Sequence, residues 1–133
     1  MTLPTNIDAT DHSGLTIDDH ESYHDALHTM YNRNRILEEN QDFILGNHGL
    51  VNVDTSSFAV TATLPDNAAY AGQSYIIRRD GANTVIIDRA GSDTFDDGDI
   101  QKTLDSDGAT IGIFSIGDGE WKILAVEGTV GGS

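Results

Sequence analysis

Residues 74–89, SYIIRRDGANTVIIDR, hold two apolar, β-branched runs on either side of the turn signal DGAN. Short runs of this kind, bounded by Gly, Asn and Asp, predict strands joined by a tight turn. The pattern recurs between the turn signals AGSD, DSDG and GDG, in the segments 57–65, 100–104, 110–116 and 120–126. Six or seven short strands with no helical period between them predict a small antiparallel β-sandwich or barrel over residues 50–127.

The segments that flank this β-module show no strand pattern. Residues 46–49, GNHG, are expected to be a linker, and residues 128–133, GTVGGS, a tail. Residues 1–15 lack any periodicity, and we expect them to form an extended arm that docks on a neighbouring chain.

Residues 16–45 predict a single helix upstream of the module. Thr16 is a candidate N-cap, and acidic residues follow it in the first turn. Residues at the alternating three- and four-residue spacing of a short coiled coil, expected to form the oligomer interface, are His20, Tyr23, Leu27, Met30, Asn34 and Leu37. The alternative is one amphipathic helix lying on its own β-domain. The predicted fold class is therefore α+β, mainly β.

The net charge of the chain limits the kinds of partner that we expect it to bind. Asp and Glu number 22 against 7 Lys and Arg, which gives a net charge of −15. Such a charge repels phosphate backbones, so we expect no nucleic-acid partner. A folded protein that works in concentrated salt fits better than a disordered acidic chain, because β-branched and aromatic runs are present. The chain has no cysteine, and no apolar run long enough for membrane insertion.

A peptidase motif occurs within the predicted helix. Residues 20–24, HESYH, match the HExxH pattern, in which His20 and His24 would bind zinc and Glu21 would activate water. His28 does not have the spacing of the third histidine in the extended motif, and a third ligand from the same helix is geometrically excluded. We therefore expect no metal and no catalytic residues here, and treat a metallopeptidase as a remote alternative.

Two further features are candidate binding sites. The Asp-rich segments 93–99 and 105–108 suggest cation binding, but counting from Asp93 does not give the ligand spacing of an EF-hand, and turn residues are the simpler interpretation. Trp121, Tyr70 and Tyr75 are possible ligand contacts that could stack on a sugar, which makes a carbohydrate-binding module the alternative function. The competing interpretation of Trp121 is an aromatic anchor in the core or in an interface. No cofactor is expected.

Three stretches together resemble structural proteins of tailed viruses. They are LVNVDTSSFAVTATLPDNAAYAGQSYIIRRDGANTVIIDRAGSDTFDDGD at 50–99, GIFSIGDGEWKIL at 112–124 and DDHESYHDALHTMYN at 18–32. The first two resemble the small β-module of tail fibres and spikes, and the third is similar to a helix found near the start of such virion proteins. No catalytic residues come with this resemblance.

The resemblance implies a non-enzymatic virion protein. Such modules form surface projections such as tail fibres, spikes or capsid turrets, and sometimes attach to a host glycan or protein. It also implies a homo-oligomer, with a trimer favoured, whose residues 1–15 contact other virion proteins. The acidity departs from bacterial-virus members and implies an extracellular particle in high salt, from a virus of a halophilic archaeon.

Overall fold

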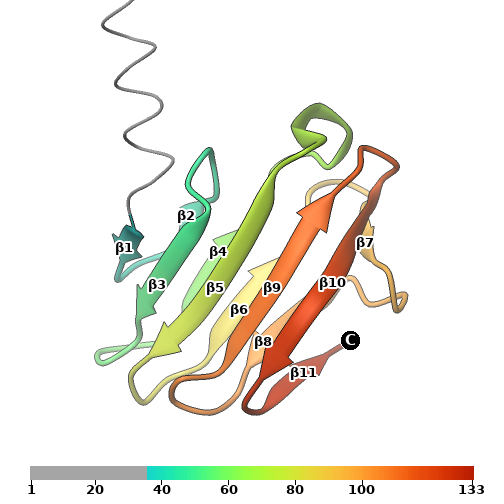
Figure 1. The fold of residues 1–133 in the computed structure, drawn as a ribbon. Coiled ribbons are helices and arrows are strands. Elements are labelled where there is room, and N and C mark those ends of the chain that lie inside the picture. The colour runs from blue at the N-terminus through green and yellow to red at the C-terminus, as the bar shows by residue number, and fades with distance from the viewer. Residues whose placement is uncertain (1–35) are drawn as a thin grey trace, which may run out of the picture. The chain divides into compact units, whose positions relative to one another are not determined.

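The strands of residues 36–133, the part of the chain that the computed structural model describes, form two sheets packed face to face (Figure 1). The chain divides into two units, Met1–Asn32 and Arg33–Ser133, and the described strands belong to the second. Sheet A has the order β1-β3-β5-β9-β10-β7 and sheet B the order β11-β8-β6-β4-β2. The strands are β1 Ile36–Glu39, β2 Phe43–Ile44, β3 Leu50–Asp54, β4 Val60–Thr63, β5 Ser74–Asp80, β6 Val85–Asp88, β7 Thr94–Phe95, β8 Gln101–Leu104, β9 Thr110–Ser115, β10 Glu120–Glu127 and β11 Val130–Gly132.

The first six strands alternate between the two sheets. β1, β3 and β5 lie parallel in sheet A, and β2, β4 and β6 lie parallel in sheet B. This half of the module is therefore a flattened coil, in which each turn adds one strand to each sheet. Strands β8, β9, β10 and β11 then pair antiparallel with their neighbours, while β7 pairs parallel with β10 at the edge of sheet A.

The predicted fold class is wrong on two counts. The α+β prediction carries a helix through residue 45, but Ile36–Glu39 and Phe43–Ile44 are strands, and the one helical element of the described residues is the 3₁₀ turn Ala68–Tyr70. The helix predicted over residues 16–35, with its coiled coil, lies outside the described part. The module is also not antiparallel, because five of the nine strand pairings are parallel.

The reason for the first error is local. In ILEENQDFIL the apolar pairs Ile36–Leu37 and Phe43–Ile44 stand on either side of the polar residues 38–42, a pattern that suits two short strands and a turn as well as it suits a helix end. Leu37 and Phe43 pack against the core of the sandwich, and this burial favours the strands.

The reason for the second error is that turn residues do not reveal which sheet the chain enters next. DGAN joins β5 of sheet A to β6 of sheet B, and DSDG joins β8 of sheet B to β9 of sheet A. Among the four turn signals, GDG alone joins strands that pair, β9 and β10. Residues 128–133, expected to be a tail, contain β11, which pairs with β8.

The core lies between the sheets and takes every second residue of the strands. β5 has the alternating pattern that the sequence predicts, with Tyr75, Ile77 and Arg79 buried and the residues between them exposed. The largest buried side chains of the core are Trp121, Tyr75, Phe95, Leu45, Leu64, Ile77, Ile87, Leu104, Ile111 and Ile113.

Gly81 should tolerate no side chain, because its φ is +134° and an added Cβ would lie 2.7 Å from the Ser56 nitrogen. We expect Gly81→Ala to lower the free energy of unfolding by roughly 2–5 kcal/mol, through backbone strain and overpacking together. Gly46→Ala is the matched control: its φ is not positive, nothing lies within 4 Å of its Cβ position, and we expect a change within about 0.5 kcal/mol. Urea unfolding in molar salt measures both, and equal effects would contradict this packing of the turn.

Candidate functional site

Two of the three predicted ligand contacts lie in the core. Trp121 and Tyr75 are fully buried, with ring centroids 5.6 Å apart. The Tyr75 hydroxyl donates a hydrogen bond to the Gly46 carbonyl at 2.5 Å, and burial raises the pKa of Tyr75. Neither ring has a face free to stack on a sugar, so the prediction of ligand contacts at these positions does not fit. The competing interpretation of Trp121, an aromatic core anchor, describes its position.

Tyr70, the third predicted contact, is half-buried at the surface. It lies in the 3₁₀ turn beside a mostly polar hollow of about 230 Å³, lined by Asn47, Ala69, Tyr70, Ala71, Gly72 and Gln73. No acid, base or nucleophile besides the Tyr70 hydroxyl lines this hollow. The hollow has room for a small polar group.

The acidic segment 93–99 encloses a lysine rather than an open cation site. The Lys102 ammonium donates hydrogen bonds to a carboxylate oxygen of Asp97 and, at 2.7 Å, to one of Asp99. It also lies 5.7 Å from the centre of the Phe95 ring. Lys102 therefore occupies the position between these carboxylates that a bound cation would need. Among the described residues, no group of three or more His, Asp or Glu side chains is arranged to hold a metal.

These contacts shift the pKa values of the cluster. The hydrogen bond from Lys102 is the main cause that lowers the pKa of Asp97. Burial opposes the charge of Lys102, but hydrogen bonds and attraction from Asp97 and Asp99 outweigh it and raise its pKa. The cluster is thus an internal ion pair at neutral pH.

Arg78 and Arg79 point to opposite faces of sheet A, as their adjacent positions in a strand predict. Arg79 is 6% exposed, and its guanidinium donates to the carbonyls of Gly81 at 2.9 Å and Leu104 at 3.1 Å. It thereby fastens the β5–β6 turn to the end of β8. Arg79 thus has a structural position.

The remaining predicted site residues lie mostly outside the described part of the chain. His20, His24, Tyr23, Leu27, Met30 and Asn34 all precede Ile36. Leu37 is the exception: it lies in β1 and packs against the core of its own sandwich, not in a seam between helices.

The most distinctive surface feature is an apolar row across the outer face of sheet A, which faces the viewer in Figure 1. The strand register places Ile36 beside Leu50, Leu50 beside Ile76, Ile76 beside Gly112, and Gly112 beside Ala125. Leu124 stands next to them at the irregularity in β10. We call this set the apolar row: Ile36, Leu50, Ile76, Gly112, Leu124 and Ala125.

The exposure of the apolar row is high for large aliphatic side chains on neighbouring strands. Ile36 is 58% exposed, Leu50 42%, Ile76 46% and Leu124 68%. Sequence reasoning missed the row, because its members come from five strands and only their register brings them together. The signal was nevertheless present at Ile76, an apolar residue at an outward position of the alternating run SYIIRR.

Polar side chains flank the apolar row on both sides. On one side the Arg78 guanidinium donates to the Asn52 amide oxygen at 3.1 Å, and the Asn52 amide donates to Asp80 at 3.1 Å. On the other side Lys122, which pairs with Phe114 across β9 and β10, donates to Asp118 and Glu120. The face thus has an apolar centre with hydrogen-bonded charges at its borders.

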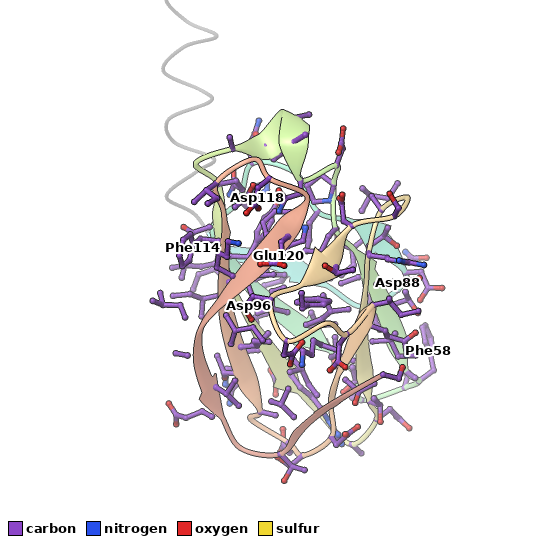
Figure 2. The ribbon with its side chains drawn as sticks, turned by 90° about the vertical axis from the view of Figure 1, so that its right-hand side faces the viewer. Phe58, Asp88, Asp96, Phe114, Asp118 and Glu120 are labelled. Carbon is purple, nitrogen blue, oxygen red and sulfur yellow. The ribbon has the colours of Figure 1, made fainter. Side chains whose placement is uncertain are left out.

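The outer face of sheet B differs from this arrangement. Its register places Thr61 beside Ile86 and Ile86 beside Thr103, and in the next row Thr63 beside Asp88 and Asp88 beside Gln101. Figure 2 shows Phe114 and Asp88 pointing away from each other on opposite sides of the sandwich. The concentration of aliphatic side chains is therefore a property of sheet A.

Comparison of the chain with protein-family models, curated proteins and solved structures found no match. Among the described residues, no helix has the length and apolar character needed to span a membrane.

Lys102→Met should expose how much the internal ion pair stabilises the module. Breaking an exposed ion pair costs ~0–1 kcal/mol of unfolding free energy, and breaking a buried one costs ~3–5 kcal/mol. We expect a loss between these values at pH 7, because the Lys102 side chain is 8% exposed but that of Asp97 is 44% exposed. Lys122→Met is the control and should cost less, because the Lys122 side chain is more exposed.

The pH dependence gives the sign of the effect. A lowered carboxyl pKa stabilises the fold fully above the unfolded value of 3.8, and this contribution is lost as the pH falls through the folded pKa. The raised pKa of Lys102 stabilises the fold below 10.5, and that contribution is lost as the pH rises through the folded value. Unfolding experiments should therefore find that wild type and Lys102→Met differ most near neutral pH, and that the difference shrinks as the pH falls through the lowered pKa of Asp97 or rises through the raised pKa of Lys102. A difference that is constant with pH would show that the ion pair is not its cause.

Proposed function

We propose that this chain is a non-enzymatic structural protein of a virus particle, and that copies of it assemble into a surface projection such as a tail fibre, spike or turret. The observation that carries the proposal is the apolar row. Exposed aliphatic side chains that line up across several strands, with polar residues around them, are typical of a surface that contacts another protein.

Two further observations support the proposal. The segments 50–99 and 112–124, on which the resemblance to virion β-modules rests, supply β3 to β7 and most of β9 and β10, and with them the buried aromatic residues Tyr75, Phe95 and Trp121. The charge of −15 suits an extracellular particle in concentrated salt, where repulsion between copies is screened over ~3 Å at 1 M. The resemblance and the acidity together lead us to propose a virus of a halophilic archaeon.

The described residues contain features that favour contact over catalysis. The buried charges of Arg79 and Lys102 are held by carbonyls and carboxylates within the fold, and the hollow beside Tyr70 has no acid–base pair. Attachment to a host surface is compatible with such a projection, and Tyr70 is the predicted ligand contact that lies at its surface.

Purified particles test this function directly. We expect an antibody raised against the full chain to label projections on intact virions in electron microscopy, and mass spectrometry of washed virions to contain this chain of 14.3 kDa in many copies. A chain that stays in the lysate of infected cells, with unlabelled particles, would contradict the proposal.

A further inference from the structure

The outer face of sheet A has a shape that can receive a copy of itself. Gly112 leaves a hollow of about 220 Å³ in the apolar row, lined by Ile76, Thr110, Gly112, Leu124, Ala125, Val126 and Glu127. Leu124, 68% exposed, stands directly beside this hollow as a projecting side chain. The face therefore presents both a depression and a side chain that fits one.

The charges of the same face are self-complementary. Residues 36–133 contain five lysines and arginines: Arg79 and Lys102 are buried, Arg89 is half-buried just after β6 of sheet B, and Arg78 and Lys122 lie on the outer face of sheet A. The carboxylates on that face, such as Glu38 and Glu127, lie in the same polar borders of the row. Lys122 is already paired with Asp118 and Glu120 of its own chain, so Arg78 is the cation of this face that carboxylates of a second copy would approach.

This charge distribution favours a second copy over a cationic partner. The acidic loops around 93–99 and 105–108 would attract a basic protein or peptide, whereas Arg78 and Lys122 on the outer face of sheet A would repel it. Between two copies of this acidic chain, Arg78 and Lys122 reduce the mutual repulsion at the outer face of sheet A.

The size of the face is adequate for a specific contact if the polar borders take part. Five strands at ~4.8 Å spacing, each with about 20 Å of length, give a flat area of roughly 500 Å² before the relief of the side chains is added. A standard interface buries about 800 Å² per partner and a specific one at least about 500 Å² per partner, so the whole face with its polar borders reaches only the lower limit. The apolar row alone is too narrow, so Arg78 and Lys122 must lie inside the contact.

From shape, charge and area together, we propose that copies of this chain pack on one another through the outer face of sheet A, with the apolar row at the centre of the contact. The inference rests on the proposed function and names the surface through which its copies assemble. The proposed interface is a sheet surface, whereas the sequence predicted a coiled coil of helices. High salt strengthens this contact, because it screens the charge of −15 and favours apolar burial when the salt is kosmotropic.

The test uses the full chain in molar salt and measures association by sedimentation equilibrium. Ile76→Glu places a charge at the centre of the apolar row, and we expect it to weaken association about tenfold or more, as truncation of a central interface residue does. Ile44→Glu is the matched control: Ile44 is 74% exposed, but it lies in β2 of sheet B. Association that is equally strong in wild type and Ile76→Glu, or a control as weak as Ile76→Glu, would overturn the proposal.

A second variant excludes loss of folding as the explanation. An added Cβ at Gly112 would lie 3.8 Å from its nearest neighbour, an ordinary contact, so Gly112→Ala should reduce the hollow with the fold retained. We expect weaker association at an unchanged unfolding midpoint, and unchanged association would count against the interface. Labelling of virions by antibody does not depend on which face joins the copies, so failure of this interface and failure of the virion function are distinguishable.

Discussion

The structure depends on the packing of two sheets through one shared apolar layer. Strands β1 to β6 cross between the sheets at each turn of the chain, so neither sheet can form without the other. Trp121 and Tyr75 from sheet A lie in this layer beside Phe95, and together they provide its largest buried side chains. Burial of an aromatic side chain of this size contributes several kcal/mol, which is a large fraction of the stability of a small domain. The requirement that every second residue faces this layer then determines what remains on the two outer faces.

The charged side chains also divide between the surface and the interior of the sandwich. The carboxylates stay at the surface, where salt and water reduce their mutual repulsion. Two cations are instead drawn inward, where Lys102 joins Asp97 and Asp99 and Arg79 joins backbone carbonyls. Because these two are used within the fold, few cations of residues 36–133 remain at the surface, and two of them, Arg78 and Lys122, flank the apolar row.

Much of the β-module could be predicted from the sequence, because strands and turns are encoded locally. The predicted runs 74–79, 84–89, 110–116 and 120–126 coincide closely with β5, β6, β9 and β10. Strand pairing could not be predicted in the same way, since DGAN leads to a partner in the other sheet and residues 36–44 form short strands held by tertiary burial of Leu37 and Phe43. The apolar row depends on pairing, so it could be found only once the register was known. Trp121 shows a second limit of sequence-based prediction. An aromatic residue on a predicted strand gives the same sequence pattern whether it lies in a core or in a binding site.

The central claim is that the outer face of sheet A joins copies of the chain, and distances between copies test it most directly. The chain has no cysteine, so a spin label can be attached at Ser74→Cys, beside the apolar row, or at Thr61→Cys on the outer face of sheet B. In the full chain at molar salt, we predict a short distance between the labels at residue 74 of two copies, because facing sheets pack about 10 Å apart. The distance between labels at residue 61 should be longer, because the thickness of both sandwiches lies between them. Shorter distances between copies at residue 61 than at residue 74 would contradict the account.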